Sequence, residues 1–162
     1  MSVLVGQARQ AFPAGDPNDQ GGNPISTPEV VGHRPASVPP LRRARALVAV
    51  ALARLLATQP PARIRTVLRC LAGRATPATY EEAKGARDDV VAVSLTCAAR
   101  EGCVPRSLAV VLLCRAAGRG VTWCVGARRV PPFGAHAWVE VDDRPVDEPY
   151  PADYFRTLFT EP

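Results

Sequence analysis

The sequence contains only two histidines and one lysine, and it has no apolar run long enough to cross a membrane. The longest such run, ALVAVALA, covers residues 46–53, whereas a membrane-spanning helix needs about 20 apolar residues. The opening MSVLVGQARQAFPAG lacks the apolar centre of a secretory signal peptide. These absences favour a soluble, cytoplasmic protein with no membrane partner.

The five cysteines include no CxxC pair. Cys97, Cys103, Cys114 and Cys124 lie six to eleven positions apart, which is not the spacing of a structural zinc site. An odd number of cysteines without a signal peptide favours reduced thiols over a disulfide framework. We therefore expect neither a bound metal nor a cofactor.

The net charge of +5 comes from one stretch of the chain. Residues 40–80 carry eight arginines and no acid, whereas residues 81–162 carry ten basic and twelve acidic residues. No aromatic residue lies between 40 and 79 to stack on bases, which argues against nucleic acid as a ligand. A solvated or partner-facing surface is the favoured interpretation. A non-enzymatic, arginine-driven binding module remains the alternative, with salt-sensitive binding that does not need Cys103.

Residues 1–39 contain six prolines and five glycines, and their apolar residues have no regular spacing that could form a buried face. The composition predicts a disordered tail over 1–39 and a folded domain over 40–162. The sequence leaves open whether this tail has an accessory function or precedes the true start of the protein.

Helices are expected in the first part of the domain. Apolar spacing and proline and glycine positions predict them over 41–58, 61–73 and 103–118, with a further helix that begins at Thr76 as N-cap. The helix from 103 is so apolar that it should be central and buried. In the first helix, the apolar residues with helical spacing are Leu41, Ala44, Val48, Leu52 and Leu55.

The spacing of the apolar residues changes after residue 120. The segments 121–127 and 135–141 have the β-branched and alternating character of strands, DDR at 142–144 predicts a tight turn, and PVDEP predicts a short return strand. We expect the segment PADYFRTLF to form a last short helix. Helices followed by a small antiparallel sheet predict an α+β fold.

Cys103 is placed at the start of the predicted central helix, with Pro105 in its first turn. A helix N-terminus lowers the pKa of a cysteine, and a nucleophile needs the resulting thiolate. The position is equally compatible with a small buried thiol in the core. The other cysteines lie within helix or strand patterns, where core packing is favoured.

His136 is the only histidine of the predicted domain and could act as the base for such a thiol. A third group should orient its ring, and Asp147 is the favoured candidate because the DDR turn brings the following strand opposite His136. Glu140, on the predicted face of His136, is the alternative. A single histidine on a strand can also be purely structural.

Two segments, GCVPRSLAVVLLCRAAGRGVTWCVGAR and PFGAHAWVEVDDRPVDE, carry a family resemblance. Within roughly residues 85–150 the chain resembles the leader peptidase of lasso-peptide biosynthesis, a branch of the transglutaminase-like (papain-like) cysteine protease superfamily. The resemblance implies a papain-like core, Cys103 as nucleophile, His136 as base and Asp147 as orienting acid. A transglutaminase-like acyltransferase would use the same triad.

The resemblance also implies a function and partners. The expected reaction is removal of the leader peptide from a lasso-peptide precursor during its maturation. The leader would be bound by a separate recognition protein, and the cyclase that closes the macrolactam is a further candidate partner. The arginine-rich helices of residues 40–80 are the candidate docking surface.

Overall fold

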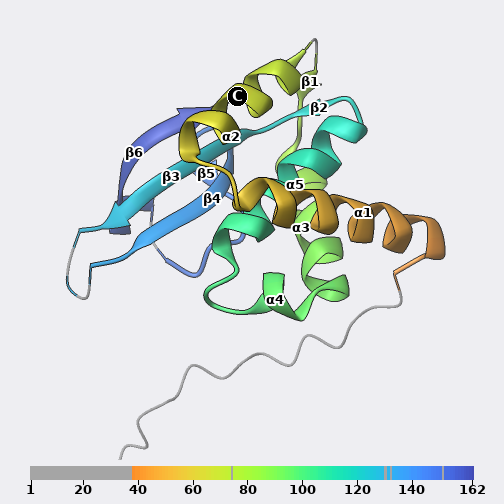
Figure 1. Ribbon diagram of the computed structural model, residues 1–162, viewed down its shortest axis with the longest axis horizontal. Coiled ribbons are helices and arrows are strands. Elements are labelled where there is room, and N and C mark those ends of the chain that lie inside the picture. The colour runs from red at the N-terminus through yellow and green to blue at the C-terminus, as the bar shows by residue number, and fades with distance from the viewer. Residues whose placement is uncertain (1–37, 74, 130, 132, 151) are drawn as a thin grey trace, which may run out of the picture. The chain divides into compact units, whose positions relative to one another are not determined.

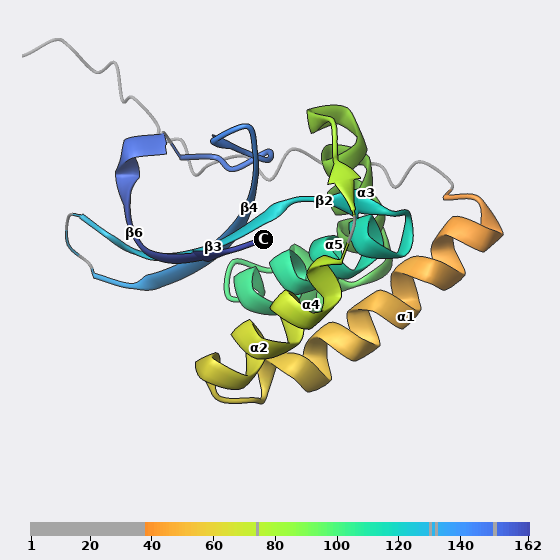
Figure 2. The same ribbon diagram turned by 90° about the horizontal axis from the view of Figure 1, so that it is seen from above.

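The computed structural model describes residues 38–73, 75–129, 131, 133–150 and 152–162. It confirms an α+β fold, with a group of helices on one side and a small antiparallel sheet on the other (Figures 1 and 2). The expected tail, residues 1–39, lies outside the described residues except for its last two. The helices are α1 (Pro40–Ala57), α2 (Pro61–Ala72), α3 (Tyr80–Val93), α4 (Leu95–Ala98) and α5 (Cys103–Ala116). The strands are β1 (Thr76–Pro77), β2 (Arg119–Gly120), β3 (Thr122–Arg128), β4 (Ala135–Val141), β5 (Arg144–Pro145) and β6 (Phe155–Glu161), with a 3₁₀ turn at Ala152–Tyr154.

Helix α5 is the centre of the fold, as its apolar sequence predicts. It contacts α1 and α3 on one side and strands β3 and β4 on the other. Its buried residues, which include Leu108, Val110 and Val111, form the core together with residues from all of these elements. None of the described helices has the length and apolar character needed to cross a membrane.

The side of helix α1 that faces the core is not the side that the spacing of its apolar residues predicted. Its buried residues are Ala46, Ala49, Val50 and Ala53, whose small side chains let α1 pack closely against α5. The larger residues Leu41, Val48, Leu52 and Leu55 are 51–67% exposed. The helix is therefore apolar on both faces, and the bulkier stripe has no partner within the described part of the chain.

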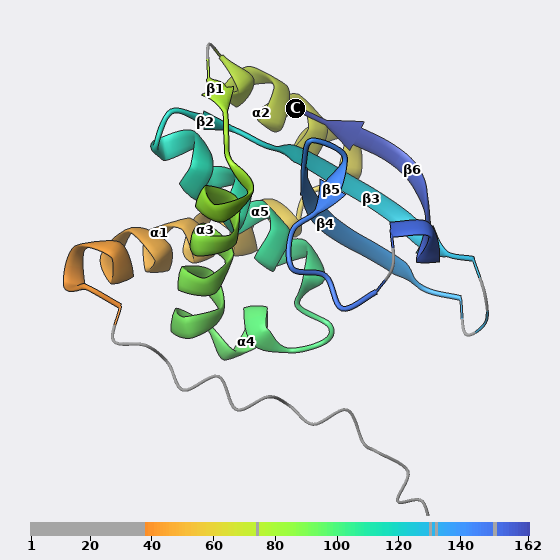
Figure 3. The same cartoon turned by 180° about the vertical axis from the view of Figure 1, so that it is seen from behind.

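The start of α3 differs from the expected position by three residues. Thr79, not Thr76, is the N-cap: its hydroxyl accepts a hydrogen bond from the backbone N–H of Glu82, whose carboxylate accepts one from the N–H of Thr79. This reciprocal capping box satisfies two backbone donors at once. Thr76 belongs instead to β1, which pairs in parallel with β2 (Figure 3).

The four-stranded sheet has the order β5-β4-β3-β6, and the pairs β5–β4, β4–β3 and β3–β6 are antiparallel. The expected DDR turn is present, with Asp142 and Asp143 both at positive φ, as a two-residue hairpin turn requires. The expected last helix over PADYFRTLF is wrong. Only one 3₁₀ turn forms there, and residues from Phe155 continue as β6 because β3 offers a free edge for backbone hydrogen bonds.

Strand β6 is fastened to helix α2 by a buried carboxylate. Glu161 is 2% exposed, and its oxygens accept hydrogen bonds from Arg65 and, at 2.6 and 2.9 Å, from Arg69. An arginine that donates two hydrogen bonds to one carboxylate is a strong, geometrically specific pair. This contact accounts for part of the arginine excess in the first helices.

Replacing Glu161 with glutamine should therefore destabilise the fold. We expect the free energy of unfolding to fall by about 1–3 kcal/mol, because the two guanidinium groups lose their charged acceptor. Urea denaturation followed by circular dichroism measures the change. Arg156→Gln on the exposed side of the same strand is the matched control, and an equal loss in both variants would contradict the assigned role.

Candidate active site

The site begins at Cys103, the first residue of α5. The first N–H groups of a helix have no partner within it and point towards whatever lies at its N-terminus. The preceding Gly102 is required for this placement, since a Cβ there would lie 1.9 Å from the carbonyl oxygen of Thr96. The close approach of α4 to the start of α5 thus fixes where the Cys103 thiol emerges.

Arg106, one turn into α5, connects this helix to the segment that precedes it. Its guanidinium donates hydrogen bonds to the carbonyl oxygens of Cys97, at 2.9 Å, and Ala99, at 3.3 Å. Ser107, the next residue, belongs to the core: it is 3% exposed and accepts a hydrogen bond from the indole N–H of Trp123. Of these two helix residues, only Arg106 contributes to the surroundings of Cys103.

His136 lies on β4, and its imidazole is near enough to the Cys103 thiol for each group to shift the pKa of the other. It projects from the sheet face opposite to Ala137 and Val139, which belong to the core against α5. Its ring is stacked on Phe155, with centroids 4.6 Å apart, and beside Trp138 at 5.8 Å. These two aromatic rings restrict the orientation of the imidazole and keep water from one side of it.

The carboxylate that contacts the imidazole of His136 belongs to Glu148. Its Oε2 lies 2.7 Å from His136 Nε2, and the two side chains are 7% and 12% exposed. Because Glu148 occupies Nε2, Nδ1 is the ring nitrogen that remains for the Cys103 thiol. The structure thus brings together Cys103, His136 and Glu148.

Asp147, the residue expected in that place, points elsewhere. Its carboxylate pairs with Arg87 of α3 and is 42% exposed, while its backbone N–H donates to the hydroxyl of Tyr80 at 3.1 Å. The hairpin register continues as far as Val146, whose N–H donates a hydrogen bond to the carbonyl of Val139. If the strand went on in this register, Asp147 would lie opposite Trp138. Asp147 instead has φ of 51°, which breaks the strand.

No pattern in the sequence pointed to Glu148. In a regular strand, Asp147 would share the face of His136, and the next residue would point away. A left-handed residue at Asp147 reverses this alternation, and the contacts with Arg87 and Tyr80, 60 and 67 positions away in the chain, hold it there. The other expected candidate, Glu140, accepts a hydrogen bond from the indole of Trp138 at 2.7 Å.

The electrostatics of the site favour a charged cysteine–histidine pair. Burial acts to raise the pKa of the Cys103 thiol, but hydrogen bonds from His136 and the backbone of Ala137, with the charge of Arg106, outweigh it and lower the pKa. For His136, burial acts to lower the pKa, and hydrogen bonds to Cys103 and Glu148 overcome it and raise the pKa to about 9. Both shifts stabilise thiolate with imidazolium at neutral pH.

This pair predicts how thiol reactivity depends on pH. Because the pKa of Cys103 is lowered, its alkylation by iodoacetamide should already be fast below pH 9 and fall only as pH drops through the lowered value. In His136→Ala, the alkylation profile should move to higher pH. Peptide mass spectrometry separates Cys103 from Cys70, the other cysteine outside the core. Superimposable profiles for Cys103 in the two proteins would contradict the pair.

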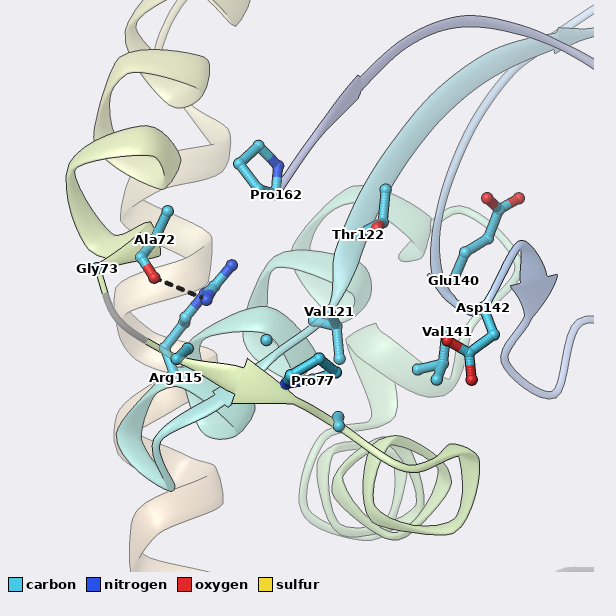
Figure 4. Close-up of a pocket in the computed structure, with 13 residues that line it drawn as sticks. Ala72, Gly73, Pro77, Arg115, Val121, Thr122, Glu140, Val141, Asp142 and Pro162 are labelled. Atoms are coloured by element: carbon cyan, nitrogen blue, oxygen red, sulfur yellow. Dashed lines mark hydrogen bonds between the residues drawn. The ribbon is translucent and has the colours of Figure 1, made fainter.

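Two cavities lie away from this site. One of about 310 Å³, between the C-terminal end of α5 and the end of β4, is lined by Arg115, Glu140 and Asp142 among others (Figure 4). Arg115 is twelve residues from Cys103 along α5, about 18 Å at 1.5 Å per residue. None of the residues that line this cavity is Cys103, His136 or Glu148. Within the described ranges, no three His, Cys, Asp or Glu side chains are grouped as metal ligands.

Comparison with known proteins places the chain in a family. A family model described as the transglutaminase-like superfamily matches residues 46–160, which include Cys103, His136 and Glu148. No curated protein and no solved structure matches the chain. Members of this superfamily are typically cysteine proteases or acyltransferases, and the grouped thiol and imidazole suit either activity. Since the match spans well over half of its residues, the chain belongs to the transglutaminase-like superfamily.

Proposed function

We propose that this protein is a cysteine peptidase in which Cys103 is the nucleophile, His136 the acid and base, and Glu148 the residue that orients His136. The observation that carries the proposal is the chain of contacts from the thiol at the helix N-terminus, through the imidazole, to a buried carboxylate. A nucleophile, a base within hydrogen-bond reach and a third group that orients the base are the components of covalent acyl transfer.

The reaction would proceed in two steps. The thiolate of Cys103 attacks the scissile carbonyl, the C–N bond breaks, and the imidazolium of His136 gives its proton to the departing amine. Water then attacks the thioester, His136 accepts the proton of that water, and the thiol leaves as the free carboxylic acid forms. Glu148 keeps the imidazole in place and stabilises its charged form in each step.

The oxyanion of each tetrahedral intermediate needs donors at a fixed position. The backbone N–H of Cys103 is suited to this role because it is at the start of α5, where it lacks an acceptor within the helix. The dipole of α5 adds positive potential at the same point. Arg106 supports this position by holding the α4–α5 connection.

The proposed substrate is the leader peptide of a lasso-peptide precursor, cut at the junction with the core peptide. The support for this substrate is the sequence of the helix from Cys103 and of the hairpin around His136, which resembles the leader peptidases of that pathway. A separate recognition protein would bring the leader to the site, and the macrolactam cyclase would use the new N-terminus.

Acyl transfer to an amine is the competing reaction, since the same three residues would serve it. The two reactions differ in the group that attacks the acyl-enzyme, which is water in hydrolysis and an amine in acyl transfer. Precursor, recognition protein and this protein are incubated in water enriched in ¹⁸O, with a small primary amine present in excess. Mass spectrometry should find ¹⁸O in the new carboxylate of the leader. A leader that carries the amine as an amide instead would identify an acyltransferase.

A further inference from the structure

The outer face of α1 has the chemistry of a protein-binding surface. Leu41, Val48 and Leu55 recur every seven residues, and Ala44 and Ala51 lie between them on the same side of the helix. Leu52 widens this stripe, and the four larger residues are 51–67% exposed. Figure 2 shows α1 at the outer edge of the helices, with α5 on its inner side. We name these six residues the α1 stripe.

The geometry of the α1 stripe fits another helix. Apolar residues at the first and fourth positions of a seven-residue repeat form the seam along which two helices pack. The stripe runs from residue 41 to residue 55, about 21 Å at 1.5 Å per residue. The small side chains of Ala44 and Ala51 would let the backbone of a partner helix come close.

The charge beside the α1 stripe selects the partner. Arg45 and Arg54 occupy the positions that flank such a seam, and with Arg43 they make no ion pair or side-chain hydrogen bond within the described ranges. Helices α1 and α2 contain no acidic residue. A second copy of the same face would bring like charges together, whereas a helix with acidic residues on either side of its apolar positions would pair with these arginines.

A groove continues this surface on one side. It has a volume of about 480 Å³, lies between α1, α3 and α5, and has apolar lining from Ala86 and Leu113. Arg45 lines the groove and is one helical turn from Leu41 and Val48, so the groove and the α1 stripe adjoin. A side chain from one end of a docked helix could be accommodated there.

We propose that the α1 stripe and its flanking arginines dock an amphipathic helix with acidic flanks, carried by the leader-recognition protein. The identity of this partner rests on the proposed function, whereas its chemistry rests on the apolar seam and the unpaired arginines. None of Cys103, His136 and Glu148 belongs to the surface. Docking would supply the leader without taking part in the bond-breaking steps.

The test measures binding of the recognition protein encoded with the precursor to the full chain by isothermal titration calorimetry, over a range of salt concentrations. Val48→Gln/Leu55→Gln should raise the Kd at least tenfold and leave its salt dependence unchanged, because buried apolar contacts are lost. Arg45→Glu/Arg54→Glu should raise the Kd at least tenfold and reduce the salt dependence, because charge attraction is lost. Arg156→Glu on β6 is the control, with a Kd within about twofold of the wild type.

Thermal melts of each variant verify that the fold is intact. Absence of wild-type binding, or an unchanged Kd in both double variants, would overturn the proposal. A wild-type dimer in sedimentation velocity that Val48→Gln/Leu55→Gln dissociates would assign the stripe to a second copy and also overturn it. Cleavage of the precursor is measured in parallel at saturating recognition protein, where the double variants should match the wild type. Weakened binding without any cleavage by the wild type would support docking and reject the peptidase function.

Discussion

Replacing Cys103 with alanine is expected to abolish cleavage of the precursor. The variant lacks the only atom in the site that can form the acyl-enzyme, and loss of a protease nucleophile lowers kcat by roughly 10⁴-fold or more. The fold should persist, because the Cys103 side chain is only partly buried at the end of a helix that many other contacts hold. Wild type and variant are incubated with precursor and recognition protein, and the products are weighed by mass spectrometry.

Cys70→Ala is the matched control for this experiment. Cys70 is an exposed cysteine of α2, so its replacement removes a thiol without touching the site. One cut at the leader–core junction by wild type and Cys70→Ala, and none by Cys103→Ala, is the expected result. Equal cutting by all three proteins would remove Cys103 from the mechanism. Binding of the partner with no cutting by the wild type would favour the non-enzymatic alternative.

Replacing Glu148 with glutamine should have the second largest effect. Glutamine keeps the size of the side chain but removes the charge that stabilises the imidazolium of His136. We expect kcat/KM to fall by about 10²–10⁴-fold, as when the acid of a catalytic triad becomes an amide. The pKa of His136, about 9 in the wild type, should fall as well, because a hydrogen bond and a charge that raise it are lost. NMR titration of the ring protons follows this pKa.

The matched change is Asp147→Asn, one residue earlier. Asp147 pairs with Arg87 and not with His136, so its amide variant should lower kcat/KM only a few-fold and leave the pKa of His136 near its wild-type value. The titration of His136 separates the two roles, since loss of the Glu148 charge lowers the pKa of the ring, whereas loss of the Asp147–Arg87 pair leaves it unmoved. A large loss and a shifted pKa in Asp147→Asn, with a silent Glu148→Gln, would favour Asp147 as the orienting acid.

Local sequence was sufficient to place the thiol and the imidazole. The apolar run after Cys103, with Pro105 in its first turn, predicted a buried helix that begins at this cysteine, and α5 begins there. The alternation around His136 and the turn at Asp142 and Asp143 predicted the hairpin, which β4 and β5 form. Such features depend on residues within a few positions of one another, so the sequence by itself determined them.

Three other features depended on distant contacts. Residues from Phe155 became a strand because β3 had an unpaired edge, although the same residues have a pattern compatible with a short helix. Thr76, the expected N-cap of α3, instead pairs with the chain near Gly118, 42 positions away, and the local capping box of Thr79 and Glu82 starts the helix. In α1, the spacing gave the helix, but the small alanines fitted against α5 and left the larger residues exposed.

The acidic residue beside His136 shows most clearly which features depend on local sequence and which depend on distant contacts. The sequence determined a cysteine at a helix start, a histidine on the following hairpin and an acidic pair, Asp147 and Glu148, after the turn. Only the tertiary structure decided which acid meets His136, because Arg87 and Tyr80 of α3 hold Asp147 at positive φ and thereby turn Glu148 towards the ring. A backbone conformation that costs free energy in isolation is set by contacts far away in the chain, and no local pattern encodes it.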